Sequence, residues 1–311
     1  MTIATIPTRN SVLRLCAVFA VVKILLHLYT NLFAGYGIFR DELYYVACTE
    51  HMAFGYVDHP PFSIWLLYVI EATIGKSVFA IRLLPALLGG GTVFLYGLIT
   101  YELGGRKLAV SLTCLAVLLS GVHLAMGTFY SMNVIDMFLW PLALYGFITL
   151  FKTGNARLWW WLAALMGLML LNKISALFFG AGLFIALLLT PERKWLATRW
   201  PFVAGMISVL LFSPYIIWNA LHGWPHLEFI HNASTYKYQG MNPGVFWSQQ
   251  LLIYNPFSLP LSLAGLVYFF RRQPDHYFRF IFLIFVTVGV ILTINWHSKP
   301  EYLAADFLYC L

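Results

Sequence analysis

The feature that most constrains this chain is a succession of apolar runs close to the length that crosses a lipid bilayer. A helix that spans the hydrocarbon core needs about 20 apolar residues, with a lower limit near 17. Most of the runs reach that length, so we predict an all-α polytopic membrane protein with about nine or ten transmembrane helices. The runs lie at about 12–39, 78–101, 107–128, 134–151, 158–171, 174–190, 201–221, 247–270 and 278–296, and a last one begins near Leu303.

The composition agrees with a membrane protein. Hydrophobic residues make up 61% of the chain and charged residues only 10%, whereas a soluble domain carries about 25% charged residues. The net charge of +7 does not indicate nucleic-acid binding, because excess Lys and Arg in a membrane protein usually lie in cytoplasmic loops.

The distribution of Lys and Arg predicts the orientation. If the N-terminus is cytoplasmic, twelve of the 19 basic residues lie in inner loops and Lys23 lies within the first helix. The six on the outer side are Arg40, Lys76, Arg82, Lys173, Lys237 and Lys299. This bias favours a cytoplasmic N-terminus. It places two long loops, at about 40–78 and 221–247, outside, so we expect any chemistry on the periplasmic or extracellular face.

The first outer loop should contain two amphipathic helices that lie along the membrane surface. Asp41 and Glu42 open the first of them, and acidic residues in a first turn favour the helix dipole. They could equally provide a general base or hold a cation. Asp58, followed by Pro60 and Pro61, is typical of a helix start and could be an N-cap.

His59 and Asp136 each allow two interpretations. His59 is either a solvated loop residue or part of a rigid binding loop fixed by the two prolines. Asp136 lies at the outer mouth of an apolar run, where it is either an interfacial helix N-cap or a functional carboxylate. Lys173 lies alone between two short apolar runs that predict a tight helical hairpin. It could pair with Asp136, bind a lipid phosphate or extend to the interface.

Later polar residues suggest phosphate binding more than metal binding. We expect no zinc site at His222, His226 and His231, because Pro225 interrupts the helix that would align them. A divalent cation elsewhere remains an alternative. His297 and Lys299 lie at an outer helix end, where they could bind a phosphate or anchor the helix at the interface. Within the first helix, Lys23 and His27 could line a cavity, or Lys23 could extend to the interface.

Six short motifs together resemble the bacterial branch of the dolichyl-phosphate-mannose–protein mannosyltransferase-like family, which includes lipid A aminoarabinose transferase and lipopolysaccharide galacturonosyltransferases. Each motif is weak alone, but they occur in the family's order over nearly the whole chain. The motifs are Asp41-Glu42-Leu43-Tyr44-Tyr45, Gly55-Tyr56-Val57-Asp58-His59-Pro60-Pro61, Ser131-Met132-Asn133-Val134-Ile135-Asp136, Leu170-Leu171-Asn172-Lys173-Ile174-Ser175, Thr190-Pro191-Glu192-Arg193 and His222-Gly223-Trp224-Pro225.

The resemblance implies the glycosyltransferase C fold in a bacterial inner membrane. Such an enzyme takes a sugar from a polyprenyl-phosphate donor and transfers it, with inversion, to a lipid, glycan or protein acceptor. By the same resemblance, Asp41, its neighbour Glu42 and Asp136 are the catalytic acids. The substrate-binding residues implied are Tyr45, Asp58, His59, Lys173, His226 and Lys299.

Two alternatives remain open. The chain could be a lipid-handling or transport protein without chemistry, although we find no internal repeat and most ionisable residues are assigned to one face. It could also be an inactive, C-terminally incomplete member, because such proteins are usually longer. In every case we expect residues 1–311 to form a single membrane domain.

Overall fold

The computed structural model describes residues 8–237, 242–254, 260, 263–265, 276–296 and 298–303. Five of the described helices are long and apolar enough to cross a membrane, so the chain is an integral membrane protein. They are α1 (Arg9–Phe33), α4 (Val78–Glu102), α7 (Met132–Thr153), α10 (Trp200–Leu221) and α14 (His276–Ile294).

Shorter apolar helices complete the bundle. α5 (Lys107–Leu119) and α8 (Leu158–Asn172) are below the usual spanning length. α9 (Ala176–Leu189) continues into the 3-10 helix η1 (Pro191–Ala197) through a bend of 105°. α8 and α9 are joined by only three residues, which confirms the predicted hairpin connection. α12 (Pro243–Tyr254) and the 3-10 helix η4 (Pro300–Leu303) lie near the C-terminus.

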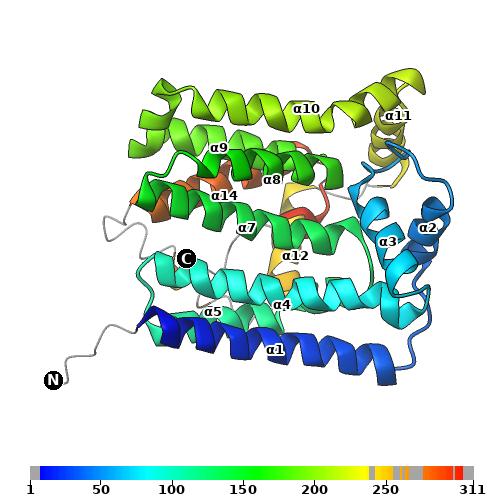
Figure 1. Ribbon diagram of the computed structural model, residues 1–311, viewed down its shortest axis with the longest axis horizontal. Coiled ribbons are helices and arrows are strands. Elements are labelled where there is room, and N and C mark those ends of the chain that lie inside the picture. The colour runs from blue at the N-terminus through cyan, green and yellow to red at the C-terminus, as the bar shows by residue number, and fades with distance from the viewer. Residues whose placement is uncertain are drawn as a thin grey trace.

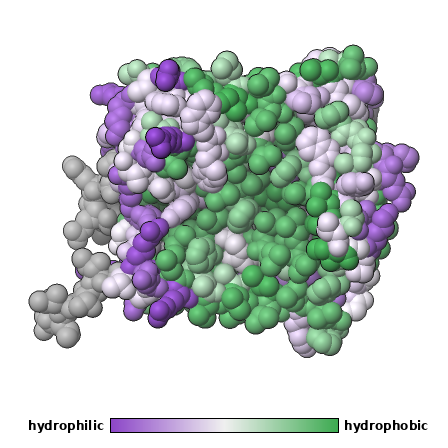
Figure 2. Space-filling model, viewed as in Figure 1, coloured by the Kyte–Doolittle hydropathy of each residue, from purple (hydrophilic) through white to green (hydrophobic). Residues whose placement is uncertain are grey.

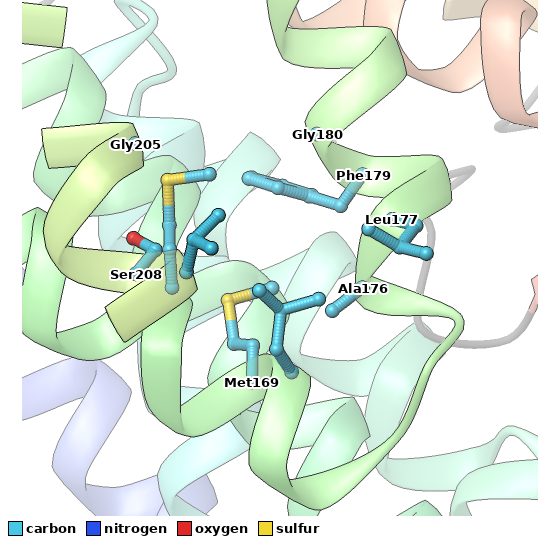
Figure 3. A pocket seen from close by; sticks show the side chains of 10 residues that line it. Met169, Ala176, Leu177, Phe179, Gly180, Gly205 and Ser208 are labelled. Carbon is cyan, nitrogen blue, oxygen red and sulfur yellow. The ribbon is translucent and has the colours of Figure 1, made fainter. Parts of the chain in front are cut away.

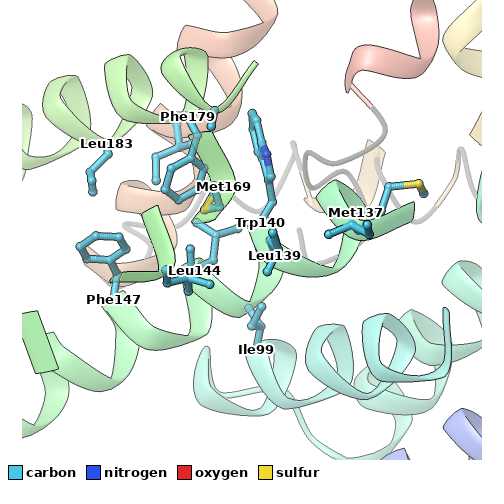
Figure 4. Packing of buried hydrophobic residues seen from close by; sticks show 14 of the residues in the cluster. Ile99, Met137, Leu139, Trp140, Leu144, Phe147, Met169, Phe179 and Leu183 are labelled. Carbon is cyan, nitrogen blue, oxygen red and sulfur yellow. The ribbon is translucent and has the colours of Figure 1, made fainter. Parts of the chain in front are cut away.

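The long helices lie side by side in a bundle (Figure 1). α1 packs against α4, α4 against α7, α8 against α10, and α9 against α14. Gly97 allows the close approach of α1, α4 and α5, because a Cβ there would lie 2.5 Å from Sγ of Cys16. Small residues serve this purpose at many membrane helix interfaces. The large side chains of Trp140, Phe147 and Phe179 fill the space between α7 and α9 (Figure 4).

The surface matches a bilayer environment. Figure 2 shows a broad hydrophobic area over the middle of the molecule, with hydrophilic residues gathered toward the two ends of the helices. Large apolar side chains such as Leu210 and Met206 of α10 are exposed. Exposing so large an apolar surface to water would be costly, so this surface is suited to contact with lipid acyl chains.

Three short helices gather at one end of the bundle (Figure 1). They are α2 (Arg40–Thr49), α3 (Phe62–Thr73) and α11 (Pro225–Asn232). α2 and α3 confirm that the first long loop is helical, and α11 begins at Pro225, as expected from the interruption there. Their orientation along a membrane surface remains a prediction.

The structure corrects several expected boundaries. The first helix ends at Phe33, before the end of the apolar run at 12–39. The run at 107–128 is not one helix, because it breaks at Ser120 between α5 and α6 (Gly121–Met126). The run predicted at 247–270 is helical to Tyr254 in α12, and most of its remainder lies outside the described residues.

Candidate active site

A buried ion pair joins the start of α7 to the end of α8. Asp136 lies in the second turn of α7, and its Oδ2 is 3.7 Å from Nζ of Lys173. Trp140 Nε1 and Ser175 Oγ each donate to the Asp136 carboxylate at 3.1 Å. Lys173 Nζ also donates to Oδ1 of Asn133 at 2.9 Å. The carboxylate is thus held from α7 and from the turn before α9.

This position settles two of the alternatives left by the sequence. Asp136 is not an interfacial N-cap, because the cap of α7 is Ser131 and Asp136 is buried. Lys173 does not extend to the interface, because its side chain is only 13% exposed. The predicted pairing of the two residues is confirmed. A carboxylate this deep is costly without such partners.

The pair borders a small pocket. Besides Asp136, Lys173 and Asn133, its lining includes Val122 and Met126 of α6 and Tyr302 of η4. The Tyr302 ring lies under the amine, with Lys173 Nζ 4.8 Å from its centroid. Ring and carboxylate together stabilise a cation at this point. Lys299, in the same segment as Tyr302, is half-buried, whereas His297 lies outside the described residues.

Glu42 lies in a second buried ion pair. Arg82 at the start of α4 donates to both carboxylate oxygens, from Nε at 2.9 Å and from Nη2 at 2.6 Å. The backbone N–H groups of Phe39 and Tyr130 donate to the same carboxylate at 2.8 and 2.9 Å. Four donors leave this carboxylate with little capacity to accept a further proton or ligand.

Asp41 and Asp58 differ from Glu42 in exposure. The Asp41 side chain is 46% exposed and pairs with Nε of Arg40 at 3.1 Å. The Asp58 side chain is 30% exposed and accepts a 2.6 Å hydrogen bond from the Tyr44 hydroxyl. Asp58 is not an N-cap of α3, whose cap position is Pro61. Both carboxylates can therefore be reached by a substrate.

His59 is buried among tyrosine rings. It stacks on Tyr45 with 5.0 Å between ring centroids and an interplanar angle of 3°, and Tyr44 and Tyr56 meet its other sides. Its Nδ1 lies 2.8 Å from the carbonyl oxygen of Pro60. Burial lowers the pKa of His59, while the Asp58 carboxylate and the Pro60 carbonyl act in the opposite direction. His59 is therefore not a solvated loop residue; the structure agrees with the rigid loop.

The second long loop, at about 221–247, packs onto the first, at about 40–78. Gly55 lies against the end of α10, where a Cβ would be 2.4 Å from Cε3 of Trp218. His226 of α11 is buried beside Tyr215. Burial lowers the pKa of His226, and the backbone of Val57 and the Asp58 carboxylate oppose that shift. His226 therefore shares the electrostatic surroundings of Asp58.

The backbone from Tyr130 to Met132 connects the surroundings of Glu42 with those of the Asp136–Lys173 pair. Met132 donates its N–H to the Tyr45 hydroxyl at 3.1 Å, and its carbonyl accepts from Nδ2 of Asn172 at 2.9 Å. Tyr130, two residues earlier, binds Glu42. The segment before α7 thus fixes α2 and the α8–α9 turn relative to each other.

Sequence reasoning missed several partners in this region. Arg82 was counted only as an outer cation, and Tyr130, Asn133, Trp140 and Ser175 were not assigned roles. Arg82 at the start of an apolar run carried a detectable signal, because a cation next to hydrocarbon needs a partner. The predicted catalytic acids have different partners: Asp136 pairs with Lys173, Glu42 with Arg82, and Asp41 with the exposed Arg40.

The His, Asp and Glu side chains at this end of the bundle are potential metal ligands. Over the described ranges of the chain, no three His, Cys, Asp or Glu side chains come close enough to hold a metal ion. His222 and His231 are exposed. The side chains of Asp41 and Asp58 are partly exposed, so a divalent cation could reach them.

Comparison with known protein sequences gives a family match and a curated relative. The profile of the family described as dolichyl-phosphate-mannose-protein mannosyltransferase matches residues 58–218, just over half of the chain. Lipid A galacturonosyltransferase RgtD of Rhizobium johnstonii (strain DSM 114642 / LMG 32736 / 3841) is 24% identical over 261 residues, which are 83% of this chain and 54% of RgtD. The chain thus spans about half the length of that curated relative.

Solved structures share the fold. The crystal structure of ArnT from Cupriavidus metallidurans bound to undecaprenyl phosphate superposes with a TM-score of 0.72 at 17% identity, over 94% of this chain and 58% of ArnT. The apo form of the Archaeoglobus fulgidus oligosaccharyltransferase gives a TM-score of 0.58 at 15% identity, over 97% of this chain and 49% of that one. The helical bundle therefore has the glycosyltransferase C architecture.

Proposed function

The chain belongs to the dolichyl-phosphate-mannose-protein mannosyltransferase family, and on this premise we propose that it is a membrane glycosyltransferase. It takes a sugar from a polyprenyl-phosphate donor and transfers it, with inversion, to a lipid acceptor of the lipopolysaccharide class. The name of RgtD supports a lipid A acceptor, and the undecaprenyl phosphate in ArnT supports the donor class. The reaction takes place on the non-cytoplasmic face of a bacterial inner membrane, in line with the distribution of Lys and Arg.

The observation that carries the proposal is the Asp136–Lys173 pair on a pocket at the end of the bundle that also bears Asp41 and Asp58. Glycosyl transfer from a phosphate donor generates negative charge on the leaving oxygen, which a fixed cation stabilises. Asp136 and Asn133 hold the Lys173 amine beside the pocket. His226 and Lys299 lie on the later segments that could add to phosphate binding.

The transfer step can be written for this arrangement. The bond between the anomeric carbon and the donor phosphate oxygen breaks, and its electron pair leaves with the polyprenyl phosphate. A bond forms from the acceptor hydroxyl oxygen to the opposite face of the anomeric carbon, and the hydroxyl proton passes to the Asp41 carboxylate. If the acceptor is a phosphate group no base is needed, and Asp41 then orients the acceptor or holds a divalent cation.

The other predicted residues take supporting roles. The four donors to Glu42 favour a role in fixing the first outer loop over a role in proton transfer. Tyr45, Asp58 and His59 form a rigid aromatic and acidic surface, which is suited to a sugar ring and its hydroxyl groups.

An apolar cavity gives the lipid chain a place near the turn that bears Lys173. It lies between α8, α9 and α10, has a volume of 160 Å³, and is lined by residues such as Met169, Phe179 and Gly180 (Figure 3). A dry apolar cavity of about 150 Å³ is large enough to bind benzene. One isoprene unit is of comparable size.

The proposal is tested by sugar transfer in membranes that contain the protein. The wild type is compared with Asp41→Asn and Asp136→Asn at equal membrane levels, and the mass change of lipopolysaccharide and glycolipids is measured. Loss of one modification in both variants supports the enzyme. A modification that survives both substitutions refutes the assigned mechanism. A wild type that transfers no sugar from any polyprenyl-phosphate donor favours a lipid-handling protein or an inactive member.

A further inference from the structure

A helix break lies beside the Asp136–Lys173 pocket. α5 ends at Leu119, the backbone is extended at Ser120 (φ −61°, ψ 126°), and helix resumes at Gly121. Val122 and Met126 of α6 line the pocket. The position of this short helix therefore sets one wall of the pocket.

The break interrupts the hydrogen bonds of the helix. The last carbonyl groups of a helix lack partners within it, and an unsatisfied carbonyl in a bilayer is costly. Lys23 of α1 meets this need, because its Nζ donates to the Leu118 carbonyl oxygen at 3.0 Å. Lys23 is fully buried and forms no ion pair with any described residue.

The same face of α1 contacts the chain after α6. His27 follows Lys23 by one helical turn and is only 1% exposed. Gly127 follows α6 directly, and a Cβ on it would lie 2.4 Å from Nε2 of His27. α1 thus contacts both ends of the short helix.

α6 also packs against α4 through His123. The Nδ1 of His123 lies 3.0 Å from the Ser120 hydroxyl, and its ring meets the Tyr96 ring of α4 edge-on at 6.1 Å. Its side chain lies on the α1 and α4 side, whereas Val122 and Met126 line the pocket. α6 is therefore held between α1 and the pocket.

We propose that Lys23 is a positioning residue for the transfer site: its amine holds the end of α5 and so fixes the α6 wall beside Asp136 and Lys173. This inference rests on the proposed function, since it concerns the same pocket. A displacement of about 1 Å at a reacting group can reduce the rate about 100-fold, so a small movement of α6 is enough to matter.

A space-filling role alone does not explain why a lysine occupies position 23 of a membrane helix. Lys at the centre of a membrane helix costs about 2.5–3.5 kcal/mol on insertion scales. A continuous α5–α6 helix would satisfy the Leu118 carbonyl without any lysine. If Lys23 only filled space, its replacement by an apolar side chain would favour insertion and leave catalysis intact.

The test uses two substitutions of similar length, Lys23→Met and Lys23→Gln, of which only Gln keeps an N–H donor. Arg14→Met, an exposed basic residue on α1, is the control. We measure kcat and KM with a polyprenyl-phosphate sugar, thermal stability, and hydrogen exchange of Gly121–Met126.

Lys23→Met should insert into the membrane at least as well as the wild type. Its kcat should fall about tenfold and amide exchange in α6 should rise about tenfold, while Lys23→Gln recovers part of both. A Lys23→Met protein with unchanged kcat, KM and α6 exchange overturns the proposal. If the wild type transfers no sugar, the proposed function fails, and the exchange of α6 alone still decides whether Lys23 holds the helix.

Discussion

Asp136 of α7 and Lys173 of the α8–α9 turn form an ion pair of 3.7 Å that is almost completely removed from solvent. In a low-dielectric surrounding, each charge depends on the other. The pair also borders a small pocket, beside which we place the donor phosphate. Stability and activity should therefore respond differently when one charge or both are removed.

Asp136→Asn alone should lower the free energy of unfolding by about 3–5 kcal/mol, because Lys173 is left without its counter-charge. Sugar transfer should fall at least about 100-fold. The double variant Asp136→Asn/Lys173→Met should regain much of the lost stability, since no buried charge remains unpaired, but none of the activity. Thermal unfolding and transfer rates measured on the same preparations test this. A double variant that regains activity would reduce the pair to a structural role.

Glu42→Gln and Asp41→Asn should differ in their effect on stability. Gln cannot accept four hydrogen bonds at once and carries no charge, so the buried Arg82 loses its counter-charge and the protein should lose about 3–5 kcal/mol of stability. Asp41→Asn removes an exposed ion pair worth about 0–1 kcal/mol, and should leave stability nearly unchanged while transfer to a hydroxyl acceptor is lost. Thermal unfolding and initial rates separate the two effects. An active Asp41→Asn protein would exclude Asp41 as the base.

The parts of the structure that could be predicted are those fixed by bilayer length and loop position. The apolar runs identified the helices, because hydrocarbon leaves the backbone few other ways to satisfy its hydrogen bonds. The predicted topology placed Asp136 and Lys173 at neighbouring helix ends, and their pairing was one of the alternatives left open for Lys173; the structure confirms it.

Other features depend on tertiary packing that the sequence does not display. Glu42 and Arg82 lie far apart in the chain, and their pairing needs α2 to turn back onto the start of α4. The break at Ser120 had no proline to indicate it, and it requires the distant Lys23 as a donor. Asp58 precedes two prolines as a cap would, but the Tyr44 hydroxyl binds it instead.

The buried histidines should make stability depend on pH. Burial lowers the pKa of both His59 and His226 below the usual value of about 6.5. The unfolded chain therefore binds protons that the folded protein does not, so their contribution to stability is complete above about pH 6.5 and is lost as the pH falls toward the folded-state pKa values.

The midpoint of thermal unfolding should accordingly decrease from about pH 7.5 to about pH 5. His59→Phe, which keeps a ring against Tyr45, and His226→Phe should each reduce this dependence. His222→Phe, at an exposed position, is the control and should leave the pH profile unchanged. Equal profiles in all three variants would assign the pH dependence to other groups.

The cavity between α8, α9 and α10 can be filled without disturbing the helices. No atom lies within 4 Å of a Cβ built on Gly180 or on Gly205, so Gly180→Leu and Gly205→Leu should fold normally. A lipid chain gains little hydrophobic free energy on moving from the bilayer into the protein, and only packing contacts favour the cavity. We therefore expect a modest increase of about fivefold in KM for a long-chain polyprenyl-phosphate sugar, with kcat unchanged. A donor whose chain is too short to reach the cavity should show no change.

Phe184→Ala alters an exposed residue of the same helix and is the matched control. A KM that rises equally for short and long donors would show that the substitutions act on the headgroup site, and an unchanged KM for both would exclude the cavity as a lipid-chain site.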